Sequence, residues 1–270
     1  GIAALIALGI LDKLDIKRFP VDSVEAQHMQ IEAMKLAFAD TYKWVADEKY
    51  MTEVTVKDLL DDGYLSERAK LINMDQATRA SHGTPPKGGT IYLTAADESG
   101  MMVSFIQSNY MGFGSGVVVP GTGISLQNRG FSFNTSPRHP NCVAPNKRPF
   151  HTIIPGFLSK DGKPEMSFGV MGGNMQPQGH VQTLIRMLSY NQQPQAACDA
   201  PRWKVNVGMS VDVEETMPPD VRAALLARGH KIENIADSYM DFGAGQFIWK
   251  TENGYIAASD PRRDGQAVGY

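Results

Sequence analysis

The chain has 270 residues, of which 42% are hydrophobic and 20% charged, and this composition is typical of a globular protein with a substantial core. The formal net charge is −3, and the basic residues are scattered, which argues against a nucleic-acid-binding surface. Cys142 and Cys198 are the only cysteines, and no CxxC or HExxH spacing is present, so we predict two buried free thiols and no metal site.

The first eleven residues are apolar, but they lack the basic leader and the small-residue cleavage site of a signal peptide. They are also too few to span a bilayer. We therefore predict a buried helix at residues 1–11 and no contact with a membrane. Because the chain starts inside this element, we expect it to be part of a longer protein.

Residues 1 to about 74 follow a helical pattern. Asp22 and Glu25 have capping-box spacing and predict the start of a long helix. Shorter helices are predicted at residues 56–60 and 65–72. Residues 74–89 are polar and interrupted by glycine and proline, which predicts an exposed linker that is open to cleavage.

After this linker the pattern changes to strands. The predicted hairpins pair residues 90–97 with 101–107, residues 152–158 with 166–170, and residues 245–250 with 255–259. Two further helices are predicted at residues 177–190 and 218–228. Since helices and antiparallel strands are segregated, we predict an α+β fold in which sheets are covered by helices.

Thr90 stands at the start of the first predicted strand, directly after Gly89. Inside an uncut chain its hydroxyl has no base to take its proton. Cleavage between Gly89 and Thr90 would give Thr90 a free α-amine with a pKa of about 8, which can act as the base for the hydroxyl of the same residue. No GxSxG pattern is present, which disfavours a conventional serine hydrolase.

Other polar motifs have two interpretations each. Gly172-Gly173 lies between a predicted strand and a predicted helix, so its N–H groups either receive an oxyanion or only form a tight turn. For Arg129 and Arg148, taken singly, we favour a solvated position or a structural salt bridge, and for His151 and His180 a core or hydrogen-bonded histidine. Residues 112–116 are rich in glycine but lack the GxGxxG spacing of a nucleotide-binding loop.

In combination these segments resemble the γ-glutamyltranspeptidase family of N-terminal-nucleophile hydrolases. The resemblance rests on the following segments: Gly89-Thr90 at the strand start, Val103-Ser104, Phe113-Gly114-Ser115-Gly116, Gly123-Ile124, Gln127-Asn128, Pro145-Asn146-Lys147-Arg148-Pro149, Gly172-Gly173, Ala200-Pro201-Arg202 and Ala258-Ser259-Asp260-Pro261-Arg262. They extend over nearly the whole chain.

The resemblance implies a precursor that cuts itself before a threonine and folds as one αββα unit. Residues 1–89 are then the end of the large subunit, with the linker at 74–89, and residues 90–270 are the small subunit. The rest of the precursor is an expected partner, and no cofactor is expected. Assembly into a homo-oligomer is left open.

The resemblance also assigns the catalytic residues. Thr90 matches the nucleophile, and Gly89-Thr90 is the cleavage site. Ser108 occupies the position of a threonine whose hydroxyl supports the nucleophile. Gly172 and Gly173 match the pair that forms the oxyanion hole.

The substrate-binding positions depart from the family pattern. Tyr110 replaces an asparagine, Ser132 an aspartate and Arg129 a glutamine, and His151-Thr152 replace a pair of serines. Loss of a carboxylate and gain of a guanidinium change the local charge by about two units, which disfavours an α-ammonium group and favours an acidic acyl group.

These exchanges resemble a divergent branch of the family that includes oxamate amidohydrolase. We therefore predict a self-processing amidohydrolase of small molecules, with hydrolysis preferred over transpeptidation. Its substrate is either a γ-glutamyl compound such as glutathione or a small carboxylate amide such as oxamate. The alternative from another class is a family member that never matures and serves as a structural or binding protein.

Overall fold

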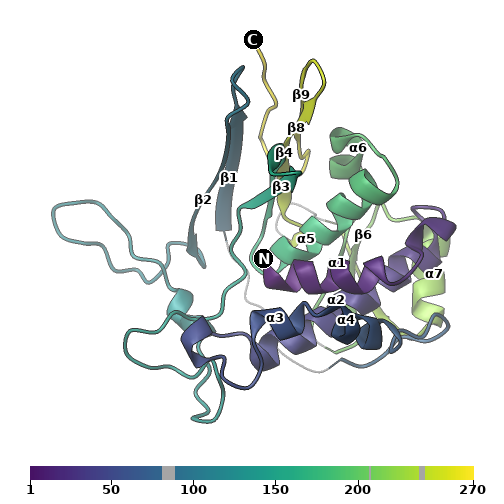
Figure 1. Ribbon diagram of the computed structural model, residues 1–270, viewed down its shortest axis with the longest axis horizontal. Helices are drawn as coiled ribbons and strands as arrows, with labels where there is room; N and C mark the ends of the chain where they lie inside the picture. Colours follow the sequence, from purple (N-terminus) through teal and green to yellow (C-terminus); the bar gives the residue numbers. More distant parts are fainter. Residues whose placement is uncertain (81–88, 207, 237–240) are drawn as a thin grey trace.

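The computed structural model describes residues 1–80, 89–206, 208–236 and 241–270 (Figure 1). Its α-helices are α1 (Ile2–Asp12), α2 (Val24–Trp44), α3 (Val56–Leu59), α4 (Asp62–Ala69), α5 (Met175–Leu184), α6 (Pro194–Asp199) and α7 (Pro219–Ala227), with short turns of helix at η1 (Ile16–Arg18), η2 (Glu48–Tyr50), η3 (Arg129–Ser132) and η4 (Ile185–Ser189). Its strands are β1 (Gly89–Ala96), β2 (Met102–Tyr110), β3 (Gly156–Lys160), β4 (Lys163–Met171), β5 (Trp203–Val205), β6 (Ser210–Glu214), β7 (Lys231–Ile235), β8 (Ala244–Thr251) and β9 (Gly254–Ser259).

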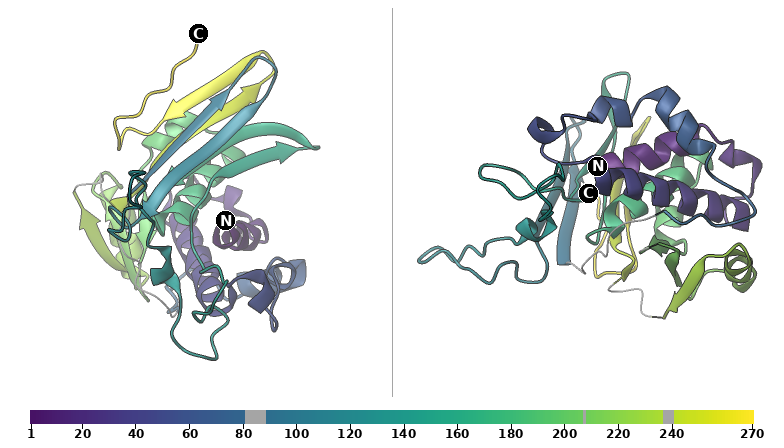
Figure 2. Two further views of the ribbon diagram at one scale, coloured as in Figure 1. Left: turned by 90° about the vertical axis from the view of Figure 1, so that its left-hand side faces the viewer. Right: turned by 90° about the horizontal axis from the view of Figure 1, so that it is seen from below.

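The elements form layers. The antiparallel hairpin β1–β2 packs on one face of a four-stranded antiparallel sheet with strand order β3-β4-β8-β9, and α5 and α6 cover the other face (Figures 1 and 2). Helices α1 and α2 pack behind α5. This arrangement confirms the predicted α+β fold with antiparallel sheets and covering helices.

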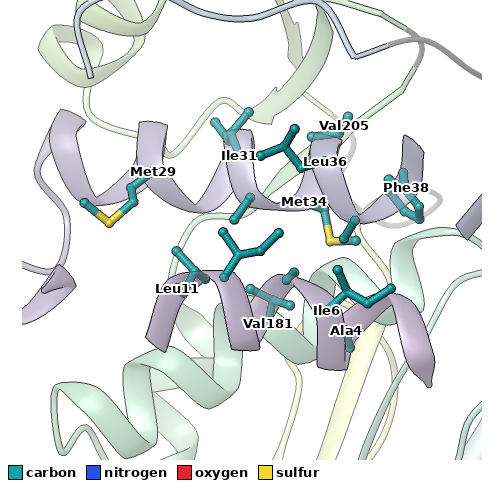
Figure 3. Close-up of a cluster of buried hydrophobic side chains, with 14 of the residues drawn as sticks. Ala4, Ile6, Leu11, Met29, Ile31, Met34, Leu36, Phe38, Val181 and Val205 are labelled. Atoms are coloured by element: carbon teal, nitrogen blue, oxygen red, sulfur yellow. The ribbon is translucent and has the colours of Figure 1, made fainter. Parts of the chain in front are cut away.

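The main core lies between α1, α2 and α5 (Figure 3). Ile6 and Ile10 of α1, Met34 of α2 and Val181 of α5 belong to this cluster, and all four side chains are fully buried. The predicted buried helix at residues 1–11 is therefore confirmed. No helix among the described residues combines the length and the apolar character needed to cross a membrane.

Two helix starts differ from the prediction. The N-cap of α2 is Ser23, whose Oγ accepts a hydrogen bond from the N–H of Ala26 at 3.2 Å. The Asp22–Glu25 capping box is therefore wrong, and the Asp22 carboxylate instead pairs with Arg186 of η4. Helix α4 begins three residues before the predicted start, because Asp61 caps the N–H of Tyr64.

The three predicted hairpins are present as β1–β2, β3–β4 and β8–β9. Residues 152–155, however, are outside β3. The sequence prediction missed α6 and the three-stranded sheet β5-β6-β7, whose pair β6–β7 is parallel. Of the predicted linker 74–89, residues 81–88 lie outside the described part of the chain.

The outer face of the β1–β2 hairpin is apolar and uncovered by the described residues. Inward-facing Tyr92 and Ser104 contact each other, and Ser104 also bonds to the sheet below. On the opposite face Leu93 pairs with Phe105 across the strands, and these side chains are 47% and 49% exposed. Ile91 on the same face is 72% exposed. A face of this kind marks a contact surface.

A buried group of four charges joins the segment of β5 and β6 to the residues that follow β9. Arg202 pairs with Asp260 at 2.5 Å, and Arg262 bonds to both Asp260 and Glu214. The Asp260 carboxylate also accepts the N–H of Gly245 at 2.9 Å. Two guanidiniums thus balance two carboxylates, and their opposite charges lower the pKa of Asp260 although its burial acts in the other direction.

Asp260→Asn should strongly destabilise the protein, because it leaves two buried guanidiniums opposite a single carboxylate. Removal of one partner from a buried pair typically costs about 3–5 kcal/mol. Urea denaturation of the wild-type and variant proteins measures this loss. Asp58→Asn is a matched control on the exposed surface of α3 and should change the unfolding free energy by less than about 1 kcal/mol. Equal stability of the Asp260 and Asp58 variants would contradict the expectation.

Candidate active site

Thr90 lies in a β-bulge. Gly89 pairs with Tyr110 and Ile91 pairs with Gln107, so Thr90 alone on β1 faces two residues of β2. A bulge re-aims side chains and is common beside active sites. Here it brings the Thr90 Oγ1 within 2.9 Å of the Ser108 Oγ, to which it donates a hydrogen bond. Thr90 is largely buried.

Ser108 connects the threonine to a cation. Its Oγ also accepts the N–H of Tyr110 at 2.9 Å, and its backbone carbonyl accepts a hydrogen bond from the Arg129 guanidinium at 3.3 Å. That guanidinium lies 5.3 Å from the centre of the Tyr110 ring, a cation–π distance. Thr90, Ser108, Tyr110 and Arg129 therefore form one continuous set of contacts.

Tyr110 has a strained backbone, with φ of 77°. A bulky residue rarely adopts this left-handed conformation, and such strain clusters at functional sites. The strain occurs at the last residue of β2, directly after the bulge. It turns the chain there and brings the Tyr110 ring beside Arg129.

Arg129 is a buried cation without an acidic partner among the described residues. It opens η3, and its side-chain contacts are the Ser108 carbonyl and the Tyr110 ring. Burial lowers the pKa of the guanidinium, but a group with so high an intrinsic pKa stays charged. An uncompensated buried cation favours an anionic ligand.

The Gly172-Gly173 turn lies between β4 and α5, with φ values of 126° and 59°. No described residue accepts a hydrogen bond from the backbone N–H of either glycine. The Gly173 carbonyl accepts the Thr152 hydroxyl at 2.9 Å, and the neighbouring Asn174 amide donates to the Tyr42 hydroxyl, also at 2.9 Å. The turn is thus fixed by hydrogen bonds to its carbonyl groups, and its N–H groups remain available to bind a ligand.

Most of the predicted site residues line two cavities. Thr90 and Ser108 line one of about 760 Å³, whereas Tyr110, Ser132, His151 and Thr152 line another of about 370 Å³. The two cavities meet at the end of β2. There Ser108, which lines the larger cavity, accepts the N–H of Tyr110, which lines the smaller one. The structure therefore brings Thr90, Ser108 and Tyr110 together at the end of β2, with Thr90 and the predicted substrate-binding residues in separate hollows. Three other predicted site residues, Arg129, Gly172 and Gly173, line neither of these two cavities.

His151 and Ser132 contribute little charge to the second cavity. Partial burial, with a smaller effect from the positive charge of Arg129, lowers the pKa of His151, so its imidazole is neutral at pH 7. The Ser132 backbone carbonyl accepts the Asn141 amide at 2.7 Å. Arg129 contacts Ser108 of the larger cavity and Tyr110 of the smaller one, while Lys43 is a further cation in the lining of the smaller cavity.

Sequence reasoning missed several residues of these cavities. Arg263 and Asp264 line the larger one, directly after the Ser-Asp-Pro-Arg segment that the sequence singled out. The smaller one is walled by four aromatic side chains from three separate segments, which are Tyr42, Phe131 with Phe133, and Phe150. Nothing in local sequence marks these aromatic residues as neighbours.

The other candidates have structural roles. The Nε2 of His180 accepts the backbone N–H of Val170 at 3.1 Å, and burial lowers the pKa of this imidazole to about 3. Arg148 pairs with Asp47 on the surface. Cys142 and Cys198 are free, as predicted, but only Cys198 is fully buried.

A family model described as gamma-glutamyltranspeptidase matches residues 1–270. The chain belongs to the γ-glutamyltranspeptidase family. It is 37% identical over its whole length to the oxamate amidohydrolase proenzyme of Klebsiella pneumoniae and 34% identical to the glutathione hydrolase-like YwrD proenzyme of Bacillus subtilis. It covers 52% of each, so it spans about half the length of these relatives.

A solved structure agrees with this family assignment. The crystal structure of cephalosporin acylase from Bacillus halodurans superposes on 99% of the chain with a TM-score of 0.89 and 49% sequence identity, and the match covers 49% of that acylase. The names of these three similar proteins refer to three different activities. The family alone does not select among glutathione, oxamate and cephalosporin substrates.

Proposed function

We propose that this chain is the catalytic part of a self-processing amidohydrolase whose nucleophile is Thr90. The observation that carries the proposal is the bulge that holds the Thr90 hydroxyl 2.9 Å from Ser108, directly after the Gly89–Thr90 bond. Residues 1–89 become the end of the large fragment and residues 90–270 become the small fragment. The relatives are named proenzymes, which agrees with maturation by cleavage.

In the cleavage step the Thr90 Oγ adds to the Gly89 carbonyl, and the proton of the hydroxyl passes to the Thr90 nitrogen. The Gly89–Thr90 C–N bond then breaks as the acyl group moves to oxygen. Water then hydrolyses this ester, which leaves a carboxylate on Gly89 and a free α-amine on Thr90. Ser108, which accepts the hydrogen bond of the Thr90 hydroxyl, orients it for this attack. Proximity of this kind lowers the entropic part of the barrier.

In turnover the Thr90 α-amine takes the proton of its own hydroxyl, and the oxygen attacks the amide carbonyl of a substrate. The N–H groups of Gly172 and Gly173 receive the oxyanion. The amine leaving group departs with the proton, and water hydrolyses the acyl-threonine. Thr152 acts here through its bond to the Gly173 carbonyl, which fixes the turn.

We propose that the acyl group of the substrate carries a carboxylate. Arg129 supports this, because it is a buried cation next to Ser108 and has no acidic partner among the described residues. The neutral His151, together with Ser132 and Tyr110, gives the adjoining hollow no negative charge that would attract an α-ammonium group. A small carboxylate amide fits these groups better than a γ-glutamyl donor.

The partner in this proposal is the rest of the precursor. The apolar outer face of the β1–β2 hairpin, formed by Ile91, Leu93 and Phe105, gives that partner a surface to cover. A homo-oligomeric contact is not needed for the proposed chemistry.

A substrate panel on the cleaved protein tests the assignment. Ammonia release from oxamate should exceed glutamate release from glutathione in kcat/KM. Arg129→Leu should lower kcat/KM for oxamate by at least about tenfold, since a charged hydrogen bond contributes about 1.5–3 kcal/mol. Arg148→Leu is the matched control at an exposed arginine and should have no effect. Faster turnover of glutathione, unchanged by Arg129→Leu, would favour the γ-glutamyl alternative.

A further inference from the structure

Residues 73–78, which include the first part of the predicted linker 74–89, are held by buried groups of two helices. This part of the linker is therefore anchored, with Ala77 buried, and is not fully exposed as predicted. The Glu32 carboxylate of α2 accepts the backbone N–H of Thr78 at 2.9 Å and also its side-chain hydroxyl. Lys35, one turn further along α2, bonds to the same carboxylate at 2.8 Å and reaches the Thr78 carbonyl at 3.4 Å. Both charged side chains are almost fully buried. The end of this segment is thus bonded through its backbone and its side chain.

The C-terminal end of α7 holds the same segment from the other side. The Arg228 guanidinium donates to the Met74 carbonyl at 3.0 Å, and the Arg228 carbonyl accepts the N–H of Ala77 at 2.6 Å. Arg228 also pairs with Glu25 of α2. Helix α2 precedes the Gly89–Thr90 bond and α7 follows it, so these contacts link the two future fragments.

Two buried histidines extend this network, and their hydrogen-bond partners determine which ring nitrogen carries the proton. The Asn73 carbonyl lies 2.8 Å from the His28 Nε2, which must therefore donate. The His28 Nδ1 then accepts from the His230 Nε2 at 2.7 Å, and the His230 Nδ1 accepts from the Lys35 ammonium at 3.1 Å. Each polar atom in this relay has a partner of the right kind.

The protonation states of the two histidines agree with this hydrogen-bond pattern. Burial lowers the pKa of His28, and burial together with the Lys35 charge lowers the pKa of His230 to about 2, so both rings are neutral at pH 7. The charged groups that face them are Glu32, Lys35 and Arg228. Lys35 and Glu32 balance each other.

A metal ion does not fit here, although His28, Glu32 and His230 have ligand atoms within 4.8 Å of one another. Two ring nitrogens bound to one zinc ion are about 3.3 Å apart, whereas the two facing nitrogens here are 2.7 Å apart. The Lys35 ammonium already supplies the cation that faces Glu32 and His230.

We propose that His28, Glu32, Lys35 and His230 form a clamp on residues 73–78 that positions the Gly89–Thr90 bond for self-cleavage. This inference rests on the proposed self-processing. The clamp leaves residues 79–89 between its last contact, at Thr78, and Thr90. Without the clamp, the segment that connects to Thr90 would start at the end of α4 and comprise residues 70–89, which is nearly twice as long as residues 79–89. Doubling a connecting segment lowers the effective concentration of its ends about threefold.

Removal of one hydroxyl tests the clamp with little disturbance. Thr78→Val loses the hydroxyl bond to Glu32 but keeps the backbone N–H bond, and we expect the first-order rate of cleavage in the intact precursor to fall by up to about threefold. Thr78→Ser keeps the hydroxyl and should restore the rate. Thr55→Val is the matched control, because the Thr55 hydroxyl also bonds to a carboxylate, that of Asp58, at 2.7 Å on the exposed N-terminus of α3. Time-resolved intact mass measures the rates, and thermal unfolding of each variant measures stability.

The outcomes separate positioning from stability. Slower cleavage in Thr78→Val than in Thr55→Val, at similar melting temperatures, supports the clamp. Equal rates in the wild type and Thr78→Val would overturn it, as would equal slowing by both variants. A wild-type precursor that is never cleaved would instead reject the proposed function. For the cleaved protein we expect slow hydrogen exchange at residues 73–78 in the wild type and faster exchange in Thr78→Val.

Discussion

Thr90→Ala is expected to abolish both cleavage of the precursor and turnover of any amide. The variant has no hydroxyl to attack the Gly89 carbonyl, so the α-amine that should serve as the base is never released. Loss of a nucleophile costs on the order of 10⁶ in kcat in a serine hydrolase, and we expect a loss of that size here. Intact mass of the purified precursor should show one uncut chain.

Thr90→Ser is the control for this experiment. It keeps a hydroxyl and, after cleavage, an α-amine, and it keeps the bond to Ser108 that the bulge allows. We expect it to be cut and to turn over substrate, though more slowly. A Thr90→Ala protein that is cut between residues 89 and 90, or that hydrolyses substrate, would reject Thr90 as the nucleophile.

Gly172→Ala is expected to lower kcat by about 10²–10³-fold, which corresponds to about 2.7–4 kcal/mol of transition-state stabilisation. A Cβ at this position would lie 3.0 Å from the Gly243 Cα, and the φ of 126° strains any side-chain-bearing residue. The turn must shift to relieve this contact, and the N–H groups shift with it. Because the oxyanion forms only during reaction, KM should change much less than kcat.

Gly162→Ala is the matched control for backbone strain. Gly162 has a positive φ of 74° in the β3–β4 turn, and a Cβ there meets no atom within 4 Å. It should therefore share the conformational cost of the Gly172 variant while leaving kcat unchanged. If both variants lose activity equally, or if Gly172→Ala keeps full kcat, the oxyanion role of the turn is wrong.

Local pattern was sufficient for much of the secondary structure. The β1–β2, β3–β4 and β8–β9 hairpins follow from alternation around glycine-containing turns, and the buried α1 follows from its apolar run. The helix starts were less well predicted. At α2 both Asp22 and Ser23 can act as a cap, and the choice of Ser23 accompanies the pairing of Asp22 with Arg186, which is 164 residues away.

The short sheet β5-β6-β7 had no comparable pattern in the sequence that would have predicted it. Strand β5 has three residues, and the parallel pairing of β6 with β7 requires the crossover through α7. The buried group around Asp260 also depends on distant partners, since its charges come from residues 202, 214, 260 and 262. Such pairings are set by packing of whole elements.

The sequence by itself determined the family and led to the proposed chemistry. A glycine–threonine pair at a strand start, the Gly172-Gly173 turn and the segments around Arg148, Arg202 and Arg262 are local features, because each needs only its own residue types in order. The tertiary structure decided the rest: the bulge that pairs Thr90 with Ser108, the contact of Arg129 with Tyr110, and the His28–His230 relay across 202 positions of chain. These depend on strand register and on contacts between remote segments, which local sequence preferences do not encode.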